Sequence, residues 1–93
     1  MTDLQAAVND ALERVSLSLL DLNARAVALA PFGEAVAATA EALHHESVSE
    51  PPPSGDETDA GRRRVETMLA ARHPWLSARA LGNLVTSYLY NWK

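Results

Sequence analysis

Apolar residues recur at helical spacing through the first third of the chain. They follow one another in alternating steps of four and three residues, which is the spacing of a packing seam in helical bundles. This seam consists of Val8, Leu12, Val15, Leu19, Leu22, Ala26 and Leu29, and a second seam consists of Leu17, Leu20, Ala24 and Val27. The pattern predicts one long helix that begins at a capping box formed by Thr2 and Gln5 and ends at Pro31. We expect this helix to form the central seam, with a second copy of the chain as one of its two neighbours.

A second helix is predicted from Phe32 to about His45, because another apolar stripe recurs at helical spacing there. The stripe consists of Phe32, Val36, Ala40 and Leu43. The next segment, 46–58, is rich in proline, serine and acidic residues and contains three consecutive prolines. Such a composition buries too little apolar surface to offset the entropy of ordering the chain. It predicts a flexible acidic linker that is polyproline-like at 51–53.

Two further helices are predicted after this linker. Asp59 is suited to cap a third helix that runs to Arg72, and Ser77 is suited to cap a fourth helix that runs almost to the end of the sequence. The buried side of the third helix would consist of Val65, Met68 and Leu69. The buried side of the fourth would consist of Leu81, Leu84, Val85, Tyr88, Leu89 and Trp92.

The predicted fold is a single all-α domain spanning residues 1–93, a small four-helix bundle with two helices on each side of the linker. A chain of this length buries only about 60% of its unfolded surface, so completion of the core by homodimerisation is expected. The sequence contains no cysteine, which excludes disulfides and thiolate metal sites. It shows no signal peptide, and its longest apolar region is interrupted by Asp21 and Arg25. We therefore expect a cytoplasmic protein that does not enter a membrane.

Basic residues concentrate toward the C-terminus of this acidic chain. The net charge is −4, but six of the eight lysines and arginines follow residue 59. Arg62, Arg63 and Arg64 form the one basic cluster. Because neighbouring positions on a helix point in different directions, these side chains do not form one stripe. A solvated start of the helix is the simpler interpretation, and contact with phosphates is the alternative.

Aromatic residues also concentrate near the C-terminus. Tyr88 and Trp92 share the apolar side of the last predicted helix, whereas Tyr90 falls on its polar side and Trp75 lies in the preceding turn. Trp, Tyr and Arg side chains often supply most of the energy at protein interfaces. We therefore predict a partner-binding face on this part of the chain. It consists of Trp75, Arg79, Asn83, Thr86, Tyr90, Arg62, Arg63 and Arg64.

The favoured function is a small non-catalytic interaction or adaptor subunit that binds a second copy of itself and another protein. The second hypothesis is a helix-turn-helix DNA-binding regulator, since two predicted helices flank the short turn at 73–75. Arg79, Asn83, Thr86 and Ser87 are chemically suited to contact bases or phosphates. The lack of a turn glycine and the net acidity weaken this hypothesis.

The third hypothesis is a metal-binding helical bundle. Glu41 and His44 have the i,i+3 spacing that contributes half of a di-metal site in such bundles. The missing carboxylates would come from Glu13, Asp21 or Glu34. A single Glu-x-x-His pair arises readily by chance, so no cofactor is expected.

No arrangement for nucleophilic catalysis is evident. Cysteine is absent, the glycines do not form a phosphate-binding loop, and His73 has no acidic residue near it in the sequence. We therefore do not expect an enzyme.

Overall fold

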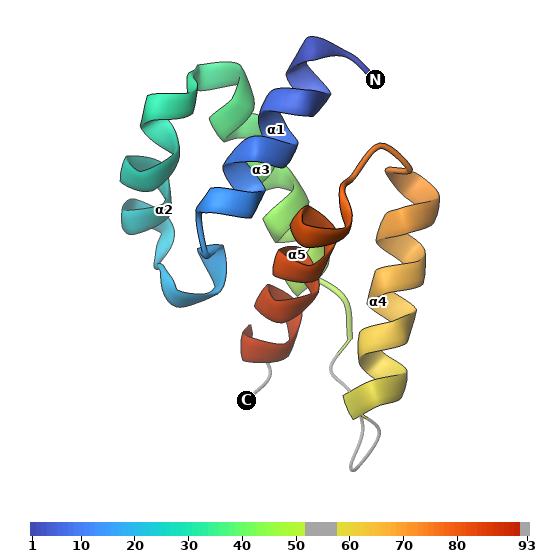
Figure 1. The fold of residues 1–93 in the computed structure, drawn as a ribbon. Helices are drawn as coiled ribbons and strands as arrows, with labels where there is room; N and C mark the ends of the chain where they lie inside the picture. Colours follow the sequence, from blue (N-terminus) through green and yellow to red (C-terminus); the bar gives the residue numbers. More distant parts are fainter. Residues whose placement is uncertain (52–57, 92–93) are drawn as a thin grey trace.

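The computed structural model describes residues 1–51 and 58–91, and these residues form an all-α fold (Figure 1). Its α-helices are α1 (Asp3–Arg14), α2 (Leu22–Leu29), α3 (Glu34–Val48), α4 (Thr58–Arg72) and α5 (Ala78–Asn91). Two short 3-10 helices, η1 (Leu17–Leu19) and η2 (Ala30–Phe32), flank α2. Within the described ranges there is no strand, and no helix has the length and apolar character needed to cross a bilayer. The predicted all-α class is confirmed.

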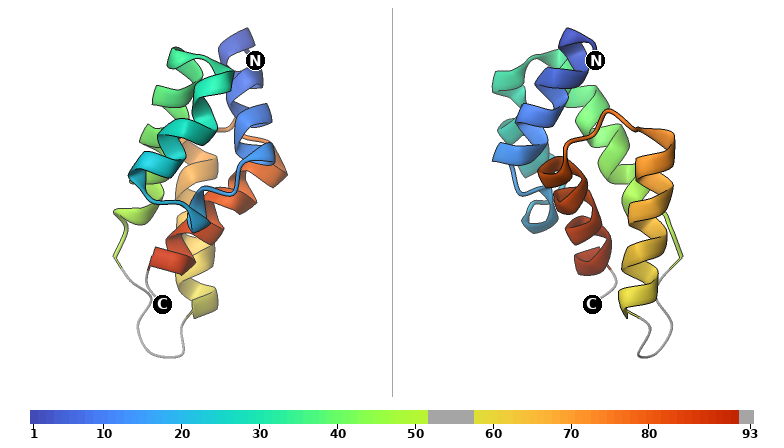
Figure 2. Two further views of the ribbon diagram at one scale, coloured as in Figure 1. Left: turned by 90° about the vertical axis from the view of Figure 1, so that its left-hand side faces the viewer. Right: turned by 45° about the vertical axis from the view of Figure 1, so that its right-hand side comes forward.

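Helix α5 lies in the middle of the molecule (Figures 1 and 2). It packs against α4 on one side and against α1, α3 and η1 on the other. Helix α2 packs on α3 at the edge of the molecule that lies farthest from α4 (Figure 1). The last helix, rather than the first, therefore provides the central packing surface.

The predicted long first helix is wrong, because the chain leaves the helical conformation between α1 and α2. Val15 is extended, and Asp21 caps a new helix with a carboxylate that accepts a hydrogen bond from the Ala24 N–H at 2.8 Å. Serine and aspartate side chains compete with the helical backbone for hydrogen bonds, and this stretch contains Ser16, Ser18 and Asp21. The described ranges consequently hold five α-helices instead of the predicted four.

Two predicted helix starts are confirmed in atomic detail. The Thr2 hydroxyl accepts the Gln5 N–H at 3.1 Å, and the Gln5 side chain accepts the Thr2 N–H at 2.9 Å. The Ser77 hydroxyl accepts the Ala80 N–H at 3.2 Å at the start of α5. Local sequence signals were sufficient at these two positions because every partner lies within three residues.

Helix α3 extends to Val48, past its predicted end near His45. Ser47 is fully buried, and its hydroxyl donates to the Leu84 carbonyl of α5 at 2.6 Å. This contact joins segments distant in sequence, so the composition of the segment did not indicate it. The predicted linker therefore starts too early at residue 46, and it also ends late, because Thr58 already belongs to α4. Positions 52–57 of that prediction lie outside the described residues.

The core draws on all five helices and is mostly aliphatic. The apolar faces predicted for the last three helices are confirmed, with Tyr88 fully buried and Phe32, Met68 and Trp75 at the margin of the core. Trp92, predicted to share the face of Tyr88, lies outside the described residues. The buried apolar residues are Val8, Ala11, Leu12, Leu17, Leu29, Val36, Ala40, Leu43, Val65, Leu69, Ala80, Leu84, Val85 and Tyr88.

Gly33 joins η2 to α3 with φ of 96° and ψ of 158°, a conformation that is nearly restricted to glycine. A Cβ at this position would meet no atom within 4 Å, so the strain of a side chain would come from the backbone alone. We expect Gly33→Ala to lower the free energy of unfolding by about 1–3 kcal/mol in urea denaturation.

Gly82 provides the matched control for this prediction. It lies exposed in the middle of α5, and a Cβ there also meets nothing within 4 Å. Because alanine favours the helix, Gly82→Ala should raise the free energy of unfolding by about 0.5–1 kcal/mol. A loss of stability of the same size in both variants would contradict this assignment.

Candidate functional site

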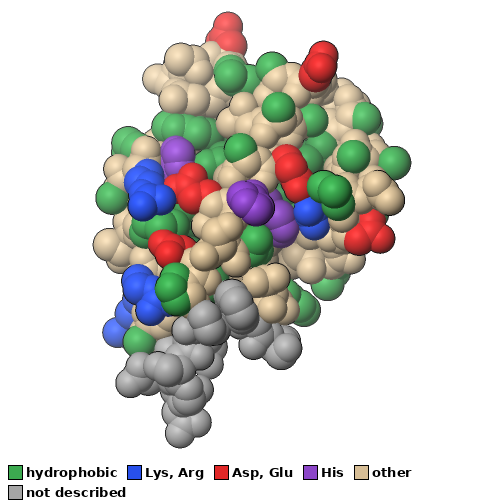
Figure 3. All heavy atoms as spheres, turned by 180° about the vertical axis from the view of Figure 1, so that it is seen from behind, with side chains coloured by type: hydrophobic (Ala, Val, Ile, Leu, Met, Phe, Trp, Pro, Cys, Tyr) green, Lys and Arg blue, Asp and Glu red, His purple; other side chains and the backbone are tan. Residues whose placement is uncertain are grey.

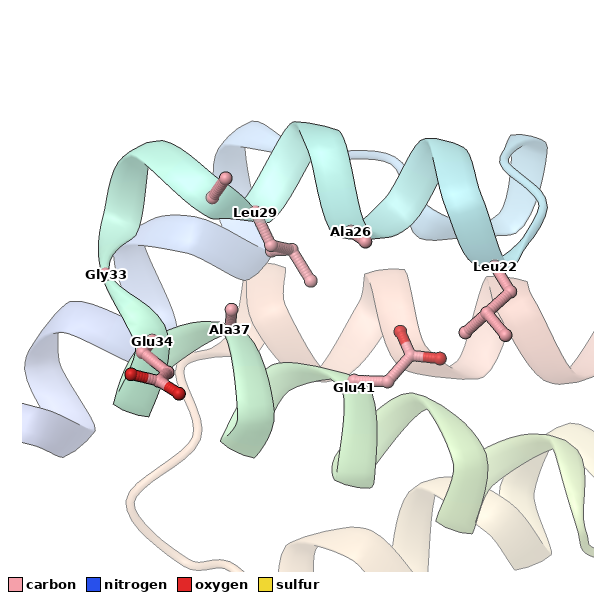
Figure 4. Close-up of a pocket in the computed structure, with 8 residues that line it drawn as sticks. Leu22, Ala26, Leu29, Gly33, Glu34, Ala37 and Glu41 are labelled. Carbon is pink, nitrogen blue, oxygen red and sulfur yellow. The ribbon is translucent and has the colours of Figure 1, made fainter.

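An apolar groove of about 380 Å³ runs between α2 and α3 (Figure 4). Leu22, Ala26 and Leu29 point from α2 toward α3, and Ala37 and Glu41 point back from α3. The lining residues are Leu22, Ala26, Leu29, Ala30, Gly33, Glu34, Ala37 and Glu41. None of them is basic.

The groove is lined by small residues at one end and by a large side chain at the other. Ala30 and Gly33, at the end nearer the α2–α3 connection, are small and exposed. Leu22, in the first turn of α2, is 63% exposed. Leu29 is only 1% exposed and anchors α2 to the core. One surface therefore presents both a largely exposed leucine and a hollow lined by small residues.

Two more large apolar side chains are uncovered on α2 and on the 3-10 helix that precedes it. Leu19 in η1 is 69% exposed and Val27 in α2 is 75% exposed. The sequence placed both on buried seams of one long helix, and the break after α1 explains why they are not covered. The groove was not predicted from the sequence, and the capping aspartate at position 21 was the available signal for it.

Glu41, in the lining of the groove, forms an ion pair with Arg25 of α2. The Arg25 Nε lies 2.9 Å from Glu41 Oε2, an Nη2 lies 2.8 Å from Glu41 Oε1, and Nη1 donates to the Leu20 carbonyl at 2.9 Å. The hydrogen bonds from Arg25 hold the pKa of the Glu41 carboxyl below its ordinary value, against the opposing effect of burial. At neutral pH the pair is therefore ionised and its two charges balance.

The lowered pKa of Glu41 predicts an acid-dependent loss of stability. A carboxyl with a depressed folded-state pKa stabilises the fold above its unfolded pKa, and that contribution disappears as the pH falls through the folded value. Glu41→Gln should therefore be less stable than wild type at pH 7, and the difference should shrink below about pH 4.5. Urea denaturation between pH 7 and pH 3 measures this. A difference that stays constant to pH 3 would show that the charge of Glu41 contributes nothing.

A second, polar cleft of about 310 Å³ lies on the other side of Arg25. His44 lines it, is 7% exposed, and has an Nδ1 atom with no hydrogen-bond partner among the described residues. Burial, followed by the charge of Arg25, lowers the pKa of this imidazole, so it is neutral at pH 7. The full lining is Leu17, Ser18, Leu20, Arg25, His44, Val48, Ser87, Tyr90 and Asn91. The sequence offered one signal for it, since His44 follows Ala40 by four residues on the apolar stripe.

The structure engages the main metal-ligand candidates in other contacts. Both oxygens of Glu41 accept hydrogen bonds from Arg25, and His44 faces the polar cleft. Asp21 is used as the cap of α2. Among the residues that the structure describes, no three His, Asp or Glu side chains gather into a group that could hold a metal ion.

The structure brings an acid to His73 that the sequence did not reveal. Glu46 Oε2 lies 3.0 Å from His73 Nε2, and Glu46 Oε1 lies 2.9 Å from Arg72 Nη1. Burial raises the pKa of Glu46, but these hydrogen bonds outweigh it and the pKa is lowered. Within the described ranges, no serine or threonine hydroxyl is hydrogen-bonded to a histidine ring. The cluster therefore fixes the α4–α5 turn to α3 and does not form a nucleophile–base pair.

The residues predicted on α5 and its preceding turn divide into outward and inward groups. Arg79 and Thr86 are exposed, and Tyr90 is 46% exposed. Trp75 is half-buried against the core, and the Asn83 side chain donates to the Leu12 carbonyl of α1. Arg79, Thr86 and Tyr90 are therefore the more exposed members of this part of the predicted face, and Tyr90 also lines the polar cleft.

The predicted arginine cluster lies at the other end of this helix pair. Arg64 donates to the Pro51 carbonyl at 2.8 Å and to the Tyr88 hydroxyl at 3.1 Å, near the end of α5. Arg62 lies within 4.0 Å of a carboxylate oxygen of Asp59 and of one of Glu66, and Arg63 is exposed. Since α4 and α5 run antiparallel, these arginines are remote from Arg79 at the start of α5 (Figure 1). Figure 3 shows basic side chains mainly on the α4 side of the rear face, interspersed with acidic ones.

Two of the polar side chains on α5 make hydrogen bonds within the protein. Ser87 is 2% exposed, and its hydroxyl donates to the Asn83 carbonyl at 3.2 Å. The Asn83 side chain is held by α1, as described above. Two of the four side chains predicted to contact bases are therefore engaged inside the protein, and a recognition helix must present such side chains outward.

The fold and these hollows define a small all-α protein with an open apolar groove at one edge. Comparison with protein families, curated proteins and solved structures gives no match to this chain. Its function must therefore be inferred from its own residues and geometry.

Proposed function

We propose that this protein is a small non-catalytic interaction protein, an adaptor subunit, that binds an amphipathic α-helix of a protein partner in the α2–α3 groove. The observation that carries this proposal is an apolar groove with small residues on its walls and a largely exposed leucine, Leu22, in its lining. An amphipathic helix that lays its apolar face into such a groove is a recurrent mode of protein recognition.

The dimensions and chemistry of the groove favour a helix as the bound element. Helix α2 has eight residues and is about 12 Å long, enough to contact roughly two turns of a partner helix. Ala26, Ala30 and Ala37 allow the close approach of helix axes, to about 8 Å. The remaining charge on the lining is the exposed Glu34, because Glu41 is balanced by Arg25. A basic flank on the partner helix would complement that acid.

An adaptor needs a second surface, and the outward side of α5 supplies a candidate. Arg79 and Thr86 are exposed there, and neither lines the groove. Both residues belong to the partner face that the sequence predicts. They also remain open when the groove is filled.

A synthetic 18-residue leucine–lysine amphipathic peptide tests the groove. Added in excess to ¹⁵N-labelled protein at low micromolar concentration, it should shift the amide signals of Ala26, Gly33 and Ala37. Ala37→Trp, which fills the groove, should abolish these shifts, whereas Ala42→Trp on exposed α3 surface outside the lining should retain them. Shifts confined to α4 and α5, or no shifts in monomeric protein, would contradict the proposed function.

A further inference from the structure

We infer that the helix bound in the groove is α2 of a second copy of this chain, packed antiparallel to the first α2 about a two-fold axis near Ala26. This inference rests on the proposed function, because it names the occupant of the same groove. In the resulting dimer, α2 and α3 of each copy would form the interface.

The first support is that the surface is complementary to itself. A two-fold dimer uses the same patch on both copies, so the patch must contain each projecting group and the hollow that receives it. Here the projecting Leu22 and the small residues Ala30 and Gly33 lie on one groove. A groove built only to receive another protein has no need of a leucine that projects from its own rim.

The second support is the spacing of large and small residues, which selects the antiparallel direction. Leu22 precedes Ala26 by four residues, and Ala30 follows it by four. In an antiparallel pair centred on Ala26, Leu22 of each copy therefore lies opposite Ala30 of the other. A parallel pair would set Leu22 against Leu22 and Ala30 against Ala30, which produces a clash at one end and a void at the other.

The third support concerns charge and area. No basic residue lines the groove, and Glu41 in its lining is paired with Arg25, so apolar contact must provide the attraction. A standard interface buries roughly 800 Å² per partner, about a seventh of the 5533 Å² surface of this chain. A short helix such as α2 reaches that area only if it also contacts α3 of the other copy. Self-association in the micromolar range is the expected consequence.

Because the chain has no cysteine, single-cysteine variants report the geometry directly. Ala26→Cys places the thiols of the two copies at the two-fold axis, within the Cα separation of about 4.4–6.8 Å that a disulfide requires. Ala30→Cys separates them by eight residues along antiparallel helices, about 12 Å. Ala70→Cys, exposed on α4, measures random collision. Under mild oxidation Ala26→Cys should form covalent dimer at least about tenfold faster than the other two variants.

Each result decides a separate point. Rapid cross-linking of Ala26→Cys alone supports the antiparallel dimer. Rapid cross-linking of both Ala26→Cys and Ala30→Cys indicates parallel helices and overturns the proposed register. Cross-linking of Ala26→Cys no faster than Ala70→Cys overturns the second copy as occupant. In that case the leucine–lysine peptide tests the proposed function by itself. Shifts of the groove signals with the peptide would support helix binding in the groove. Their absence would contradict both the proposed function and the dimer.

Discussion

Asn9→Ala should lower the free energy of unfolding by about 2–4 kcal/mol, although position 9 lies on neither apolar seam of the sequence. Asn9 is 6% exposed and joins α1 to the α4–α5 turn. Its Nδ2 donates to the Trp75 carbonyl at 2.9 Å, and its Oδ1 accepts the Ser77 N–H at 2.9 Å. Alanine would leave both backbone groups without a partner in a largely buried place, and such groups cost about 1–3 kcal/mol each.

Urea denaturation measures this effect, and Asn23→Ala provides the matched control. Asn23 is exposed on α2, so its replacement should change the free energy of unfolding by less than about 0.5 kcal/mol. Asn9→Asp keeps the acceptor for Ser77 but sets a carboxylate oxygen against the Trp75 carbonyl, so it should also destabilise the protein. Equal stability of Asn9→Ala and Asn23→Ala would show that the bridge does not hold the turn.

Tyr88→Ala should lower the free energy of unfolding by about 3–5 kcal/mol, the cost of removing a large aromatic side chain from a packed core. Tyr88 is fully buried on α5, and its hydroxyl donates to the Pro51 carbonyl at 2.6 Å. A domain of this size has a total stability of about 5–14 kcal/mol. The variant should therefore show a large decrease in thermal unfolding temperature, followed by circular dichroism.

Two further variants separate the ring from its hydroxyl and from the neighbouring aromatic residue. Tyr88→Phe keeps the ring and should cost about 1 kcal/mol, because the Pro51 carbonyl and Arg64 lose a partner. Tyr90→Ala removes a half-exposed ring and should cost less than about 1 kcal/mol. If Tyr90→Ala were as destabilising as Tyr88→Ala, the assignment of one tyrosine to the core and the other to the surface would be wrong.

The sequence predicted those features of the fold that depend on neighbouring residues. The capping box at Thr2, the cap at Ser77 and the apolar faces of the later helices all involve partners within one or two helical turns. The prediction was wrong where one polar side chain is compatible with two local structures. Asp21 was compatible with the middle of a long helix and with the cap of a new one, and only the packing of Leu17 and Leu29 into the core selects the cap.

The candidate site was harder to predict because it depends on the break between α1 and α2, which the sequence did not reveal. Leu22, Ala26 and Val27 have helical spacing in either case, so the pattern could not show that they face solvent. For a related reason, the structure divides the predicted partner face into exposed residues and residues that contact the core. Helical phase placed Asn83 beside Arg79, but the phase does not reveal that α1 offers the Leu12 carbonyl as a partner. Contacts of this kind join residues more than sixty positions apart.

The measurement that tests the groove most directly is the mass of the protein in solution by light scattering, from tens to hundreds of micromolar. Wild-type protein should approach twice the chain mass of 10.0 kDa as its concentration rises, and added salt should not weaken the association. Leu22→Glu should remain at 10.0 kDa with unchanged helical content. Leu4→Glu, at an exposed leucine of α1 outside the groove, should associate like wild type. A wild-type mass of 10.0 kDa at every concentration, or equal association by Leu22→Glu, would contradict the α2–α3 dimer.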